Sequence, residues 1–133
     1  MYIKNIKNAA ILLFLGAKLD RVVLLKHRYT NKWMLPGGMI DKTDICPFIA
    51  MKREFKEETG IKLPILNQPI TSYIYNGHTK IYIACTHAKI GPFIPNNEAI
   101  EMKFVKIDDI FRYKLRSSVK KSLKKINKIF FLF

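Results

Sequence analysis

Glu54, Glu57 and Glu58 are spaced so that an α-helix would place all three carboxylates on one face. Like charges held this close repel one another, and a divalent cation relieves that repulsion. All-oxygen ligands suit Mg²⁺ or Mn²⁺. Arg53 lies four residues before Glu57 and can pair with it. The spacing therefore predicts a metal site. The alternative, a solvated acidic helix edge, is disfavoured because four of the ten acidic residues fall between Asp44 and Glu58.

The flanking residues define the elements that must position these carboxylates. Pro47 suits the first turn of a helix and Gly60 suits the stop after the last, so we expect a helix over Pro47–Thr59. Earlier in the chain, Gly37 and Gly38 lack side chains, which lets the backbone come close to a metal or a phosphate.

This segment resembles the Nudix hydrolase family, whose motif reads G-x5-E-x7-R-E-U-x-E-E-x-G-U, where U is a bulky aliphatic residue. Arg53–Ile61 meets every specified position, with Phe55 at the first aliphatic one. The resemblance extends to Trp33–Gly38, which is similar to the strand and loop before the motif. One extra residue in the loop before the helix departs from the pattern, and Asp44 becomes a shorter substitute for the family glutamate.

The resemblance implies a hydrolase that cleaves the pyrophosphate linkage of a nucleoside diphosphate bonded to a further group. It implies that Mg²⁺ or Mn²⁺ is held by Glu54, Glu57, Glu58 and the carbonyl of Gly37. Glu57 and Arg53 then belong to the catalytic machinery. A further base or ligand is implied from a later loop, where Glu98 is favoured over Glu101 because a turn at residues 95–97 leaves it on the loop.

Other residues are candidates for binding substrate. Lys26 and Arg28 flank His27 and could reach a phosphate, although cations on a strand edge commonly face water. Trp33 either stacks on a base or fills the core. Gly38 would give a phosphate access to the backbone.

Composition limits the class of protein. The chain has 133 residues, which predicts a single domain over residues 1–133, and 49% of them are hydrophobic, which excludes a disordered chain. Two cysteines without CxxC spacing give no zinc signature and indicate a reducing compartment, so we expect a cytoplasmic protein. The net charge of +14 favours an anionic partner such as a nucleotide, RNA or an acidic membrane surface.

The last part of the chain is the most basic. Residues 106–133 carry nine basic and two acidic side chains. An apolar stripe at helical spacing predicts an amphipathic helix; it consists of Val119, Leu123, Ile126 and Phe130. Its basic face is interpreted as solvated, with an RNA or membrane contact as the alternative. Phe130–Phe133 forms an apolar tip that packs on the body or touches a partner. No apolar run approaches the roughly 20 residues of a membrane span, so we expect no integral membrane segment.

The remaining pattern predicts strands on both sides of the central helix. The expected strands are Ala9–Leu15, Arg21–Tyr29, Thr71–Tyr75, Lys80–Thr86 and Met102–Ile107, with helical structure from Asp108 onward. Asn76-Gly77 predicts a hairpin turn. A short signal peptide is the alternative for the first apolar run. The fold class is α/β or α+β: with the family resemblance, an α/β/α sandwich with a mixed central sheet, one catalytic helix and a basic C-terminal helix.

The leading functional hypothesis is a metal-dependent pyrophosphohydrolase acting on a nucleoside triphosphate or a similar small nucleotide. The basic charge favours hydrolysis of RNA 5′ caps as an alternative. A catalytically silent RNA-binding module is a more remote one, because such a module has no need for mutually repelling carboxylates.

Overall fold

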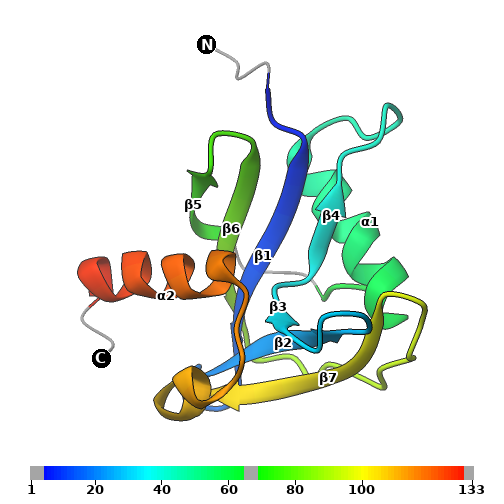
Figure 1. Cartoon of the computed structure of the whole chain (residues 1–133). Coiled ribbons are helices and arrows are strands. Elements are labelled where there is room, and N and C mark those ends of the chain that lie inside the picture. Colours follow the sequence, from blue (N-terminus) through cyan, green and yellow to red (C-terminus); the bar gives the residue numbers. More distant parts are fainter. Residues whose placement is uncertain (1–4, 65–68, 131–133) are drawn as a thin grey trace.

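A computed structural model describes residues 5–64 and 69–130. Its elements are β1 (Asn8–Leu15), β2 (Arg21–His27), β3 (Trp33–Met34), β4 (Gly37–Met39), α1 (Pro47–Thr59), β5 (Pro69–Tyr75), β6 (Thr79–Thr86), β7 (Ala99–Lys106), a 3₁₀ helix η1 (Ile107–Arg112) and α2 (Ser117–Phe130). The strands lie between two helices, with α1 on one side and α2 on the other (Figure 1). This is the mixed α+β sandwich predicted from the sequence.

The strands of the described ranges form one mixed sheet with β1 at its centre. β1 pairs in parallel with β6 along its whole length. The other edge of β1 pairs antiparallel with β4 near its start and with β2 near its end. β2 also pairs with β3 and β7, and β6 pairs with β5. β4 pairs with the first residues of β1, and α1 packs against β4. The two glycines of β4 therefore lie beside α1.

Alternate residues of β1 enter two different cores. Ile11 and Leu13 pack on the α1 side, in a cluster that includes Phe55. Leu12 packs on the α2 side with Leu123. A strand covered on both faces needs apolar residues at every position, which explains the uninterrupted run that also resembles a signal peptide. The strand prediction for this run is confirmed.

Local signals set the ends of α1 where they were predicted. The helix begins at Pro47 and ends at Thr59. Gly60 adopts a left-handed conformation with φ of 72°, and its N–H donates to the Lys56 carbonyl at 2.8 Å. A residue with a side chain pays a steric cost in this conformation, so glycine is the favoured stop.

Two strand predictions were wrong at their ends. β7 starts at Ala99 rather than Met102, because Ala99 is buried and pairs with His27 across a register shift. β2 stops at His27 rather than Tyr29, because the chain turns there and the Asn31 N–H donates to the His27 carbonyl.

The amphipathic C-terminal helix is α2. Val119 and Leu123 are fully buried against the sheet, as the apolar stripe predicts, and the lysines occupy the outer face. The Phe130 side chain and residues 131–133 lie outside the described residues, so the fate of the apolar tip stays a prediction. Among the described helices, none has the length and apolar character needed to cross a membrane.

Candidate active site

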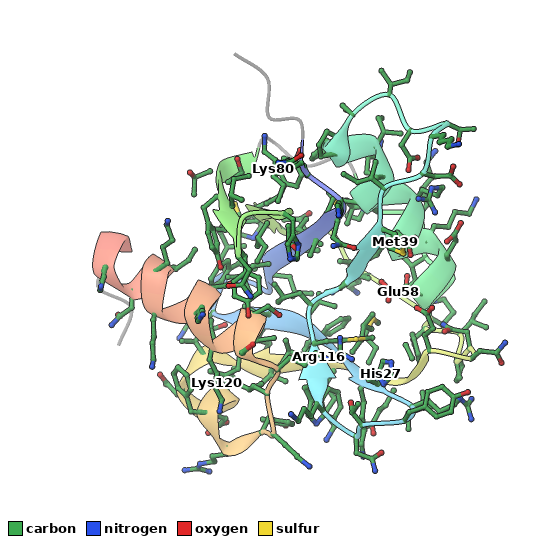
Figure 2. All side chains as sticks on the ribbon, turned by 45° about the horizontal axis from the view of Figure 1, so that its top comes forward. His27, Met39, Glu58, Lys80, Arg116 and Lys120 are labelled. Atoms are coloured by element: carbon green, nitrogen blue, oxygen red, sulfur yellow. The ribbon has the colours of Figure 1, made fainter. Side chains whose placement is uncertain are left out.

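The three glutamates of α1 share one face but differ in exposure. The Glu57 side chain is 57% exposed and that of Glu54 is 15% exposed. Glu58 is buried, with 4% exposure. Figure 2 shows Glu58 on the side of α1 next to β4. The carboxylates therefore run from solvent at Glu57 to the protein interior at Glu58, along the side of the helix that faces β4.

The two glycines of β4 bring the backbone against these carboxylates. The Gly37 N–H donates to Glu58 Oε1 at 2.7 Å. A Cβ atom at Gly38 would lie 2.5 Å from Cδ of Glu54, so Glu54 occupies the space that a side chain would fill. In the ladder between β4 and β1, the Ile11 N–H donates to the Pro36 carbonyl and the Ile40 N–H donates to the Lys7 carbonyl. Gly37 lies opposite Ala10, at a non-hydrogen-bonded position of this ladder. The Gly37 carbonyl is therefore not required by the ladder.

Arg53 joins the loop before α1 to the glutamates. Its Nε and Nη2 donate to the two carboxylate oxygens of Asp44 at 3.1 and 2.8 Å. Nη2 also donates to the Met39 carbonyl, and Nη1 reaches Glu54 and Glu57 at 3.1 and 3.2 Å. The Arg53 guanidinium holds the pKa of Asp44 below its ordinary value. Asp44 thus forms an ion pair with the arginine of the motif despite the extra residue in the loop.

We expect Asp44→Asn to lower metal affinity about 10- to 100-fold, as loss of an outer-shell partner commonly does. Without the carboxylate, Arg53 is free to pair more fully with Glu54 and Glu57 and to compete with a cation for them. Mn²⁺ binding, measured by titration calorimetry, checks this expectation. Asp108→Asn, an exposed change on η1, is the control. Equal affinities in all three proteins would contradict the anchoring role of Asp44.

Burial and mutual repulsion make the carboxylates hard to ionise. Burial, followed by the charges of Glu54, Glu98 and Glu57, raises the pKa of Glu58 to about 8, although the Gly37 N–H bond opposes this. Burial also raises the pKa of Glu54, as do the charges of Glu57 and Glu98. Glu98 thus acts on the buried glutamates although it lies on another part of the chain.

The stability of the metal-free protein should therefore fall as pH rises. The protonated form of Glu58 is favoured in the fold, so its contribution is complete below the unfolded pKa of 4.5 and is lost as pH rises through about 8. The loss is on the order of 4 kcal/mol, and the raised pKa of Glu54 acts in the same direction. Urea unfolding in a chelator at pH 5.5, 7 and 8.5 measures it. A free energy of unfolding that rises across this range would contradict the expectation.

The donor set fits a hard divalent cation. Glu58 is buried, its carboxylate accepts from the Gly37 N–H, and the charges that act on it are those of the carboxylates Glu54, Glu98 and Glu57. Burying such a group as an anion is costly unless positive charge is supplied. Across residues 5–64 and 69–130, no three Asp, Glu, His or Cys side chains are already arranged as a metal site. In this arrangement Arg53 contacts Glu54 and Glu57, while Glu58 accepts from the Gly37 N–H. Carboxylate oxygens beside a side-chain-free backbone remain the ligand type that Mg²⁺ or Mn²⁺ accepts.

An open hollow lies next to these residues. It has a volume of about 380 Å³ and is lined by Met39, Ile40, Asp41, Lys42, Arg53 and Glu54. Lys42 and Arg53 supply positive charge at its wall, so it can admit an anionic group beside Glu54.

Three predicted site residues lie elsewhere. Trp33 is 6% exposed and packs edge-on against Tyr113 in the core on the α2 side, which agrees with core filling, the second of its two expected roles. Lys26 lies over the Trp33 ring at 6.0 Å, on the face of the sheet away from the glutamates. Glu101 pairs with Lys103, whose ammonium also lies over Trp33. Neither Lys26 nor Glu101 is brought to the carboxylates of α1.

The contacts of the Arg28 side chain differ from the expected contact with a phosphate. Its guanidinium donates to the backbone carbonyls of Asn96 and Asn97, at 3.0 and 3.1 Å, rather than standing free for a phosphate. Arg28 thereby binds the loop that carries Glu98.

The family model of the NUDIX domain matches residues 5–126. The chain belongs to the Nudix family. The motif, the mixed sheet and the helix that carries the glutamates agree with this, and the chain is accordingly a Nudix pyrophosphohydrolase. Among curated proteins, none matches the sequence.

Solved structures share this Nudix fold at low sequence identity. An Ap4A hydrolase from C. elegans has a TM-score of 0.70 at 19% identity, covering 96% of this chain and 99% of the other. MutT from Aliivibrio salmonicida and Vibrio cholerae has a TM-score of 0.70 at 21% identity, with coverages of 96% and 100%. The NUDIX domain of Shewanella oneidensis NrtR, complexed with ADP ribose, has a TM-score of 0.70 at 14% identity, with coverages of 96% and 89%.

Sequence reasoning missed Asn96 in this Nudix site. Its side chain accepts from the N–H groups of Glu98 and Ala99, both at 3.0 Å, and donates to the backbone carbonyl of Glu58. The Pro95-Asn96-Asn97 sequence signals a turn, but no local pattern signals that this amide reaches a helix 38 residues earlier in the chain.

Proposed function

We propose that this chain, acting as a single domain, is a Mg²⁺- or Mn²⁺-dependent hydrolase of a small nucleotide, with nucleoside triphosphates as the first candidates. The observation that carries the proposal is the convergence of Glu54, Glu57 and Glu58 beside the glycines of β4, within range of the charge of Glu98. When bound, a divalent cation neutralises phosphate oxygens and lowers the pKa of water, which allows attack on phosphorus near neutral pH.

The protein groups then have separate tasks. Glu54, Glu57 and Glu58 hold the cation together with the Gly37 carbonyl. Arg53, anchored by Asp44, keeps Glu54 and Glu57 in place. Glu98 serves as the base or as a further ligand. Gly38 leaves room for the Glu54 carboxylate and for the approach of a phosphate.

The distribution of charge favours a small substrate over RNA. The lysines of α2 account for much of the positive excess, but α2 covers the face of the sheet opposite α1 (Figure 1). Figure 2 shows Lys120 on α2, across the strands from Glu58. At the hollow beside Glu54, the cationic lining residues are Lys42 and Arg53. The names of similar structures also mention small nucleotides, namely Ap4A and ADP ribose.

A phosphate-release screen tests the proposal. Purified protein is given nucleoside triphosphates, ADP-ribose, Ap4A or cap-labelled RNA, with Mg²⁺, with Mn²⁺ or with a chelator. We expect turnover of a small nucleotide that requires the metal and is lost in Glu57→Gln. The Glu57 side chain is exposed, so this substitution leaves the packing of the core unchanged. Turnover that persists in the chelator or in Glu57→Gln would overturn the proposal, and so would cleavage of capped RNA alone.

A further inference from the structure

Glu98 lies on the loop before β7, and its backbone is tied to the end of α1. Its side chain is exposed, so packing of that side chain does not hold it in place. The negative charge of Glu98 acts on those of Glu54 and Glu58, and like charges repel. Contacts of the loop backbone must therefore keep Glu98 near α1.

Asn96 supplies contacts in both directions. Its Oδ1 accepts from the N–H groups of Glu98 and Ala99, which fixes the backbone of the loop around its own side chain. Because two backbone donors define this atom as the oxygen, the other end of the amide is the donor. That end donates to the carbonyl of Glu58, in the last turn of α1. The Asn96 side chain thus joins the backbone of Glu98 to the backbone of Glu58.

The end of α1 needs such a donor. The last carbonyls of a helix have no partner within the helix. The Gly60 N–H satisfies Lys56, and the Ile94 N–H donates to the Thr59 carbonyl at 2.9 Å. Asn96 satisfies Glu58 between them. The loop thus completes the hydrogen bonding of the helix end, which ties its position to the glutamates of that helix.

Arg28 holds the same loop from β2. Its guanidinium donates to the carbonyls of Asn96 and Asn97, and its backbone N–H donates to the carbonyl of Glu98 at 2.8 Å. Between β2 and β7 the register shifts next to His27, so this part of the ladder departs from regular pairing just after Glu98. The loop is therefore bound on one side by α1 and on the other by Arg28.

We propose that Asn96 is a positioning residue that holds Glu98 toward Glu54 and Glu58 by tying the loop to the end of α1, with Arg28 as the second anchor. This inference rests on the proposed function, in which Glu98 serves as base or further ligand. In this role the Asn96 amide does not act on the substrate. It holds the loop in place against the repulsion between Glu98 and the carboxylates of α1.

Two variants and a matched control test the inference. Asn96→Ala removes all four side-chain hydrogen bonds, those from the N–H groups of Glu98 and Ala99 and those to the carbonyls of Glu58 and Ile94. Asn96→Asp keeps an acceptor for the two backbone N–H groups and replaces the donor to Glu58 and Ile94 with a carboxylate oxygen, which makes it the safer variant if alanine prevents folding. Asn97→Ala changes the same residue type in the same loop but retains the backbone carbonyl that Arg28 binds.

Amide hydrogen exchange is the first readout, because it needs neither metal nor substrate. We expect exchange at Glu98 and Ala99 to become at least about tenfold faster in Asn96→Ala, which removes the acceptor of both amides, and to stay unchanged in Asn97→Ala. Unchanged exchange in folded Asn96→Ala would overturn the inference. If the exchange changes as expected but the wild-type protein hydrolyses no nucleotide, the proposed function fails while the tie between loop and helix stands.

A double-mutant cycle is the second readout. In the wild-type background we expect Asn96→Asp to lower kcat about 10- to 100-fold with little change in KM. In a Glu98→Gln background the same change should cost less than about twofold, because the group that Asn96 positions is already disabled. Equal losses in the two backgrounds would show that Asn96 acts on something other than Glu98, and would overturn the inference.

Discussion

Gly38→Ala is expected to fold with nearly the stability of the wild type and yet to lose about 100-fold in metal-dependent hydrolysis. The new Cβ would lie 2.5 Å from Cδ and Oε2 of Glu54. These atoms are the far end of a flexible side chain, so the Glu54 carboxylate moves away at little cost to the fold. The movement is comparable to the 1 Å misplacement that can lower a rate by about 100-fold.

Gly37→Ala is the matched comparison because its clash is with backbone. The Cβ would lie 2.3 Å from the Ala9 carbonyl and 2.5 Å from Cα of Ala10, and the φ of Gly37 is 155°. We expect a loss of about 3 kcal/mol in the free energy of unfolding. Gly38→Ala should stay within about 1 kcal/mol of the wild type. Urea unfolding and Mn²⁺ titration of both variants separate the two effects. A Gly38→Ala protein with normal metal affinity and turnover would remove Glu54 from the metal site.

Glu58→Gln is expected to stabilise the metal-free protein while removing its activity. At pH 8 the wild type carries the cost of a buried carboxylate whose pKa is about 8, and a neutral amide of the same shape avoids it. The Gln side chain keeps an oxygen to accept the bond from the Gly37 N–H. The gain should be about 2 to 4 kcal/mol at pH 8.5 and should shrink toward zero near pH 5.

The same Glu58→Gln change removes an anionic ligand from the proposed site. We expect turnover to fall by more than about 100-fold, beyond the usual loss for an outer-shell partner. The measurements are urea unfolding at several pH values and the nucleotide assay with Mg²⁺. A variant that is less stable than the wild type at pH 8.5 would show that Glu58 is not under electrostatic strain, and retained activity would show that it is not a ligand.

Features with local causes were predictable from the sequence. The ends of α1 follow from Pro47 and Gly60, which act through their own backbone conformations. The hairpin between β5 and β6 follows from Asn76-Gly77, where both residues have positive φ. The grouping of Glu54, Glu57 and Glu58 follows from helical spacing alone.

Features that depend on distant segments were not predictable in the same way. Trp33 was a reasonable stacking candidate by its type, but the face of β3 it occupies is set by the pairing of β2 and β3. Arg28 has the chemistry to bind phosphate and instead binds a loop about 70 residues away in the chain. Periodicity and spacing describe neighbours along the chain, and these contacts arise only when the sheet is assembled.

The basic charge of the chain illustrates the same difference. A net charge of +14 indicates an anionic partner but does not locate the contact. In the structure, Lys121 and Lys125 lie over the rings of Tyr75 and Tyr73, so part of the lysine face covers aromatic side chains of β5. The interpretation of this face as the solvated side of a packed helix is in keeping with these positions.

The central place of β1 has a consequence for the order in which the chain folds. β1 is synthesised first, but Asn8 pairs with Thr79, 71 residues further along. β2 in turn waits for β7, which begins at Ala99. The edge of β1 that pairs with β6 therefore stays open until residues 79–86 have been synthesised, and open apolar edges favour aggregation. Pairing at this sequence separation also slows folding, because the entropy of closing a long loop is lost before the contacts between the strands stabilise the chain. The acidic helix can form early, but its site is completed only when the last strand joins the sheet.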